Sequence, residues 1–155
     1  MTKQSAVEFL TAQGHLSEVE DFEDGNAYVS FKYRGTPIVL HTYENDPTFL
    51  YMKCGYRLEP ADRDELFVLR AIKKLEDNYQ IAKIGYIADH LSIYATAEQF
   101  IPECPEFAEI FWRTAGLVSS AASEAWNEVN AIVIADKAAE RFTEALEAEL
   151  HGEPK

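Results

Sequence analysis

Residues 27–57 read AYVSFKYRGTPIVLHTYENDPTFLYMKCGYR and decide the fold. Apolar and polar residues alternate along this stretch, which is punctuated by Arg34-Gly35 and by Asn45-Asp46-Pro47. A period of two is typical of β-strands, because successive side chains point to opposite faces of a sheet. With a charged edge strand at Glu18–Phe22 and a turn at Asp24-Gly25, the pattern predicts a four-stranded antiparallel meander.

The alternation sorts the meander side chains onto two faces. One face is apolar and is the predicted core face, with members such as Val29, Phe31, Ile38, Leu40, Leu50 and Met52. The other face sets aromatic rings and a histidine among charges: Tyr28, His41, Tyr43, Phe49 and Tyr51. Because aromatic rings concentrate at protein interfaces, we predict a partner or dimer surface there. The alternative is that the last helix folds back and covers this face.

A short helix precedes the meander, and a hairpin comes later. Val7, Phe9 and Leu10 form the apolar side of the helix, and Gly14 is its expected C-cap. Residues 81–95 alternate again and predict two strands that turn at Ala88-Asp89-His90.

A second helix is expected between the meander and the hairpin. Asp62 and Glu65 form an N-terminal box, and Asn78 is the expected stop. The predicted core stripe of this helix contains Leu66, Leu69, Ile72 and Leu75 and is widened by Phe67, Val68 and Ala71.

The last third of the chain is helical from Pro105, with apolar residues at helical spacing as far as Leu146. Residues 126–130, WNEVN, interrupt the pattern because Asn favours helix ends. This leaves two helices or one bent helix, with residues 131–150 as a C-terminal extension. The apolar stripe of the extension contains Ile132, Ala135, Ala139, Phe142 and Leu146. It is expected to be buried against the sheet or a second copy.

These elements predict an α+β fold in a single domain, residues 1–155. An antiparallel sheet of about five to six strands, made of the meander plus the hairpin, carries helices on one face.

The amino-acid composition limits the classes of binding partner that are expected. The chain has 155 residues, of which 47% are hydrophobic, and a net charge of −13 from 27 acidic and 14 basic residues. Phosphate backbones and anionic lipid surfaces attract basic proteins, so neither nucleic acid nor a membrane is an expected partner. No signal peptide or apolar run of about 20 residues is present, which predicts a cytoplasmic protein.

No catalytic or cofactor motif stands out. His41, Tyr43 and Glu44 lack a second histidine at ligand spacing, so no metal is expected. Cys54 and Cys104 are isolated and are interpreted as buried or half-buried thiols. The chain has no nucleophile elbow and no glycine-rich phosphate loop. We therefore expect no cofactor and a non-enzymatic protein.

A family resemblance comes from the order of elements and a few positions. The Asp24-Gly25 turn, the stretch KKLEDNYQIAKI (73–84) with Asn78, and Leu91-Ser92-Ile93 resemble YbjN-like proteins over about residues 4–128. That family is described as bacterial sensory transduction regulators with a type III secretion chaperone-like fold. The resemblance implies no catalytic residues. Secretion chaperones of this fold are small, acidic and commonly dimeric, and they bind unfolded segments.

The expected function is therefore a chaperone-like or regulatory domain that binds a protein partner or client through an apolar surface, as a homodimer. Two alternatives remain open at this point. One is a small-molecule-binding domain or enzyme with a pocket between sheet and helix around His41, Tyr43 and Tyr51. The other is an immunity or antitoxin protein whose acidic surface blocks a basic toxin.

Overall fold

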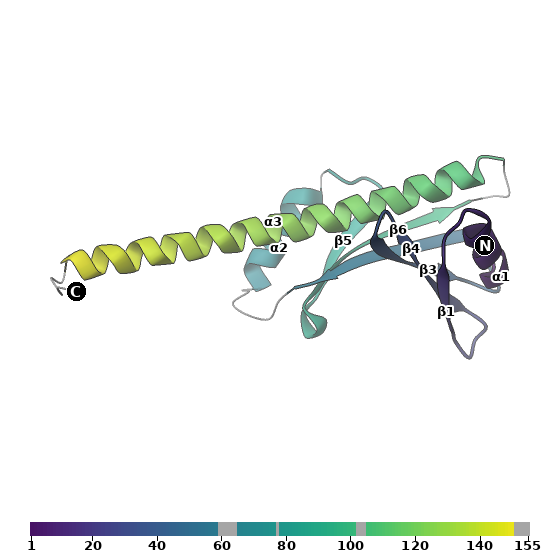
Figure 1. Cartoon of the computed structure of the whole chain (residues 1–155), viewed down its shortest axis with the longest axis horizontal. Helices are drawn as coiled ribbons and strands as arrows, with labels where there is room; N and C mark the ends of the chain where they lie inside the picture. Colours follow the sequence, from purple (N-terminus) through teal and green to yellow (C-terminus); the bar gives the residue numbers. More distant parts are fainter. Residues whose placement is uncertain (59–64, 77, 102–104, 151–155) are drawn as a thin grey trace.

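The computed structural model describes residues 1–58, 65–76, 78–101 and 105–150. In these ranges the chain forms three α-helices and one six-stranded antiparallel sheet, which confirms the α+β class (Figure 1). The elements are α1 (Lys3–Ala12), β1 (Ser17–Asp21), β2 (Ala27–Tyr33), β3 (Thr36–Thr42), β4 (Phe49–Arg57), α2 (Glu65–Glu76), β5 (Ala82–Ile87), the 3-10 turn η1 (Ala88–His90), β6 (Ser92–Phe100) and α3 (Phe107–Leu150). Asp62 and Cys104 lie outside the described residues.

The strand order in the sheet is β1-β2-β3-β4-β6-β5. The meander is joined by tight turns, and the β2–β3 turn has positive φ at Arg34 (50°) and Gly35 (85°), as a two-residue hairpin loop requires. β6 lies between β4 and β5, because all nine residues of β4 pair with it, from Phe49 opposite Phe100 to Arg57 opposite Ser92. β5 therefore forms an edge of the sheet.

The core lies between one face of the sheet and the helices α1 and α3. Burial alternates along β2, β3 and β4 as the sequence predicts, and the apolar face is the buried one. Phe111 of α3 is fully buried, with its ring centroid 4.9 Å from that of Phe9 in α1 and 5.8 Å from that of Phe31 in β2. The C-cap of α1 is Gln13, one residue before the expected Gly14, and Gly14 follows it with a left-handed φ of 79°, as is common after a helix end.

α2 packs against α3 and β5 with part of the predicted apolar stripe. Its buried residues are Val68, Ala71, Ile72 and Leu75, whereas Leu66 and Leu69 are about half exposed. The prediction was therefore right for the buried residues, wrong for Leu66 and Leu69, and partly right for Phe67, which is half-buried. The observed set follows the i, i+3, i+4, i+7 spacing of one helix face, which a single flat contact surface can bury.

The last third of the described chain is one helix, α3, and not two. The asparagines near Trp126 do not end it, because Asn in a helix interior costs under about 0.7 kcal/mol relative to Ala. Ala125 and Val129 are buried in a second part of the core, where α3 packs against α2. The free energy gained by burying them outweighs this cost. Figure 1 shows the C-terminal part of α3 projecting past the sheet, so residues 131–150 do not fold back over it.

Two leucines offer a matched test of this core. Leu40 of β3 is fully buried, whereas Leu16, just before β1, is 94% exposed. We expect Leu40→Ala to lower the free energy of unfolding by about 2–5 kcal/mol, because it leaves a cavity in a packed core. Leu16→Ala should change it by less than about 0.5 kcal/mol. Urea unfolding followed by circular dichroism measures both, and equal effects would contradict this placement of the core.

Candidate functional site

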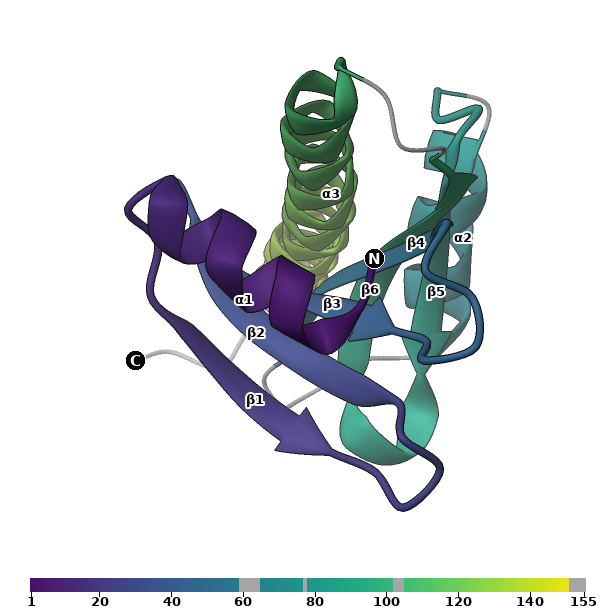
Figure 2. The same ribbon diagram turned by 90° about the vertical axis from the view of Figure 1, so that its right-hand side faces the viewer.

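The face of the sheet opposite α3 carries the predicted aromatic surface. Seven rings lie on it or at its rim, and we call them the aromatic band: Phe22, Tyr28, His41, Tyr43, Phe49, Tyr51 and Phe100. Figures 1 and 2 show α3 running along the other side of the sheet. The rings of β2, β3 and β4 in this band are half-buried, while Phe100 is 74% exposed.

Ring-to-ring contacts connect the band without a break. The first half runs from Phe22 to Tyr28 with centroids 4.7 Å apart, then to His41 at 4.7 Å. His41 contacts both Tyr43, at 4.2 Å, and Tyr51, at 6.0 Å.

The second half continues from Tyr43 to Phe49 at 5.3 Å and ends at Phe100, 5.1 Å further. Several of these pairs are edge-to-face, a geometry that favours aromatic contact. The band therefore crosses the sheet from the β1–β2 turn to the end of β6.

Two hydrogen-bonded turns lie next to rings of the band. The backbone N–H of Asn26 donates to Asp24, and the side-chain oxygen of Asn26 accepts from the N–H of Glu44 at 3.2 Å. On the β3–β4 turn, Asp46 accepts from both the N–H and the hydroxyl of Thr48. Aspartate and asparagine favour such turns because their side chains bond nearby backbone groups. Phe22 and Phe49 therefore stand on turns that are braced by hydrogen bonds.

Partial burial shifts the pKa values of three side chains in the band. Desolvation lowers the pKa of His41 below its ordinary value of 6.5, although the nearby Asp24 carboxylate opposes this shift. Desolvation raises the pKa of Tyr43 and of Tyr51, and the Glu98 carboxylate adds to both shifts. At neutral pH the band is therefore an uncharged aromatic surface beside acidic groups.

All five residues predicted for this surface come together in the structure. Phe22 and Phe100 were missed. Phe22 was assigned only to an acidic edge and turn, and the hairpin was predicted to end at residue 95. Continuing the alternation from Tyr94 through Glu98 reaches Phe100 on the same face, so the sequence did contain this signal.

Two further findings concern reactive side chains in the described part of the chain. Burial raises the pKa of the Cys54 thiol to about 11, which keeps it protonated and unreactive. Within the described ranges, no cluster of three or more His, Cys, Asp or Glu side chains could hold a metal ion.

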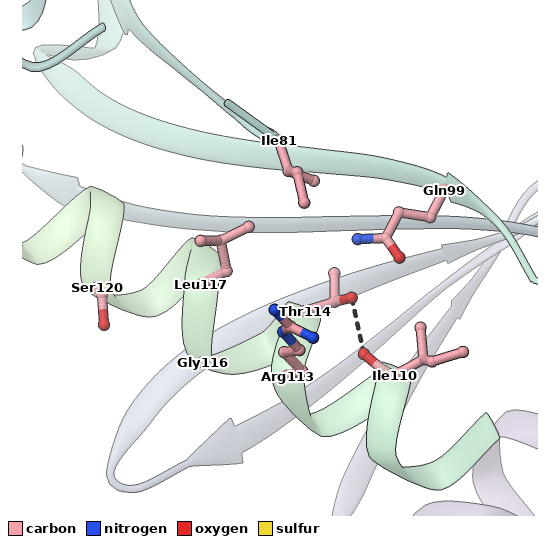
Figure 3. A pocket seen from close by; sticks show the side chains of 8 residues that line it. All are labelled: Ile81, Gln99, Ile110, Arg113, Thr114, Gly116, Leu117 and Ser120. Atoms are coloured by element: carbon pink, nitrogen blue, oxygen red, sulfur yellow. Dashed lines mark hydrogen bonds between the residues drawn. The ribbon is translucent and has the colours of Figure 1, made fainter. Parts of the chain in front are cut away.

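A cavity of about 480 Å³ lies between α3 and the sheet (Figure 3). It is lined by Ile81, Gln99, Ile110, Arg113, Thr114, Gly116, Leu117 and Ser120. The figure shows Ile81 and Gln99 facing α3 across this space. The sequence predicted a pocket between sheet and helix around His41, Tyr43 and Tyr51. These three residues do not line this cavity, because they lie on the face of the sheet opposite α3.

Comparison with known proteins supports the fold. No family model and no curated protein matches the chain. A solved structure of an uncharacterized protein from Methanothermobacter thermautotrophicus is similar, with a TM-score of 0.63 and 12% sequence identity. The match covers 84% of this chain and 97% of that one, and at this identity it shows the fold alone. The YbjN-like resemblance stays a prediction.

The sequence predicted no segment that could cross a membrane, and α3 is the helix to check first because it is the longest. Among the helices in the described part of the chain, none combines the length and the apolar character needed to cross a bilayer.

His41 provides a direct test of the site. We expect its ring to titrate below pH 6.5 in the folded protein, and Asp24→Asn to lower the midpoint further, because Asp24 favours the charged ring. With a depressed folded pKa, the stability contributed by the neutral ring is present above pH 6.5 and is lost as pH falls through the folded value. NMR titration of the ring protons measures this.

Asp89→Asn is the control for this titration, because Asp89 lies in η1 at the other end of the sheet and should leave the His41 midpoint unchanged. A midpoint above 6.5 in the unmodified protein would show that the ring is not desolvated by the band.

Proposed function

We propose that this chain is a non-enzymatic, cytoplasmic protein-interaction domain, chaperone-like or regulatory, that binds a protein partner or client as a homodimer. The observation that carries the proposal is the unbroken aromatic band on a face that α3 leaves uncovered.

Exposed contiguous apolar surface favours this function. Single apolar residues on a surface need no explanation, but a connected patch marks a site of interaction. Phe22 and Phe100, the two ends of the band, are 37% and 74% exposed. Aromatic side chains also dominate the energetics of protein interfaces, because they bury a large rigid area at a low cost in conformational entropy.

The charges around the band favour a particular kind of partner. Asp24 acts electrostatically on His41, and Glu98 acts on both Tyr43 and Tyr51. The whole chain has a net charge of −13. Lys and Arg are attracted both to carboxylates and to aromatic faces. The proposed partner segment is therefore apolar and carries basic residues.

The strand geometry of this face supports recognition by side chains. The band runs across β2, β3, β4 and β6, which are all paired within the sheet, so their backbone groups are already hydrogen-bonded. Contacts with the rings, and not strand addition, are what the band itself offers to a partner.

The proposal is tested by removing two rings of the band, the half-buried Tyr43 and the exposed Phe100. Affinity capture from the native cell with the unmodified chain supplies the partner, and binding is then measured with both proteins purified. We expect Tyr43→Ser combined with Phe100→Ser to raise the dissociation constant at least about tenfold, because both rings lie in the connected band. Binding should also weaken as salt concentration increases.

Leu16→Ser is the control, because it removes an apolar side chain that lies outside the band and is even more exposed than Phe100. It should leave the dissociation constant within about twofold, since isolated exposed residues contribute little. If the double variant binds every captured protein as well as the unmodified chain does, the band is not the binding surface.

A further inference from the structure

The C-terminal part of α3 carries a second exposed apolar surface. Beyond the sheet, Ile134 is 69% exposed, Phe142 is 68% exposed and Leu146 is 43% exposed. Four alanines of the same segment are exposed as well: Ala131, Ala135, Ala138 and Ala139. We call these seven residues the extension face.

The extension face lies on a different side of α3 from the one that packs on the sheet. The buried side of the helix contains Phe111, Ala115, Val118, Ala122, Ala125 and Val129. At about 100° per residue, the centre of the extension face is turned by more than a third of a turn from the centre of the buried side. Ile132, which the sequence placed in the same apolar stripe as Ala135 and Phe142, packs against the core and is not part of the extension face. The body of the same chain therefore cannot cover the extension face.

The extension face is complementary to itself. An antiparallel copy with Ala138 opposite Ala139 brings two of the large side chains against alanines, and it places Ile134 opposite Thr143. Phe142 then lies opposite Ala135 of the second copy, and Leu146 lies opposite Ala131. Any occupant of this face has to accept the large side chains and fill the space above the alanines, and a second copy in this register does both.

We propose that a second copy of this chain docks antiparallel on the extension face. The inference rests on the homodimer in the proposed function and gives it an interface. The paired segments, residues 131–146, span about 24 Å of helix at 1.5 Å per residue. A helix pair of this length buries on the order of 1,000 Å² in total, which is the lower limit for a specific interface.

Charge and shape agree with this arrangement. Helical periodicity places Glu140, Glu144 and Glu147 on the side of α3 away from the extension face, so they stay in solvent. Antiparallel helices also align their dipoles favourably. The two bodies lie at opposite ends of the pair, which limits repulsion between chains that each carry a net charge of −13. The aromatic band of each copy stays free, because it belongs to the opposite face of the sheet.

Sedimentation equilibrium of the full chain tests the dimer. We expect a reversible monomer–dimer equilibrium that Phe142→Ser and Ile134→Ser each weaken at least about tenfold. Glu144→Ser, on the other side of the same helix segment, should leave it unchanged. Because Phe142 and Ile134 are exposed in the single chain, these variants should keep the thermal unfolding transition measured at dilute, monomeric concentration.

The variant Ala138→Phe distinguishes specific helix packing from non-specific hydrophobic association. It adds apolar surface, so non-specific association would become stronger. In the proposed register it places a ring where two alanines meet, so the dimer should become at least about tenfold weaker.

Orientation is tested by disulfide formation. Ala131→Cys combined with Leu146→Cys should give an interchain 131–146 link on mild oxidation, whereas Ala131→Cys alone should give no 131–131 link. Peptide mapping identifies the linked residues, so Cys54 and Cys104 do not confuse the result.

A strict monomer at every concentration would overturn this inference, as would a dimer that Phe142→Ser and Ile134→Ser leave intact. A dimer that is lost instead on substitution of Tyr43 and Phe100 would place the second copy on the aromatic band. Loss of the dimer with client binding retained would separate failure of this interface from failure of the proposed function.

Discussion

The packing of α3 on one face of the sheet is the contact on which the rest of this structure depends. Phe111 lies at its centre, fully buried and in ring contact with Phe9 of α1 and Phe31 of β2. The same helix also completes the second part of the core through Ala125 and Val129, against which α2 packs. Because burial of apolar area is the main stabilising term, this one helix brings α1, α2 and the sheet into a single body.

Two exposed surfaces follow from that packing. A helix can cover only one face of a sheet, so the aromatic band on the other face stays open (Figure 2). α3 is also longer than the sheet that it covers, so its last turns continue into solvent with Ile134 and Phe142 exposed (Figure 1). The two surfaces lie on different parts of the molecule. One copy can therefore use the extension for self-association and the band for a partner.

Strand periodicity predicted more of this molecule than helix periodicity did. In β2, β3 and β4 a residue belongs to one face or the other, so alternation alone brought Tyr28, His41 and Tyr51 together. On α2, two overlapping apolar stripes fit the same sequence, and Leu66 and Leu69 were assigned to the wrong one. Nothing local decides between such stripes, because the choice depends on where the neighbouring helix and strand lie.

By itself, the sequence determined where the chain turns, which side chains share a strand face, and that five of the rings lie on one side of the sheet. These properties depend on dihedral preferences and periodicities within a few residues. Only the tertiary structure decided that β6 inserts beside β4, that α3 is one helix, and that it leaves the aromatic band uncovered. Each of those outcomes depends on contacts between residues far apart in the chain. Those contacts set the free energy of burial, and local pattern does not encode them.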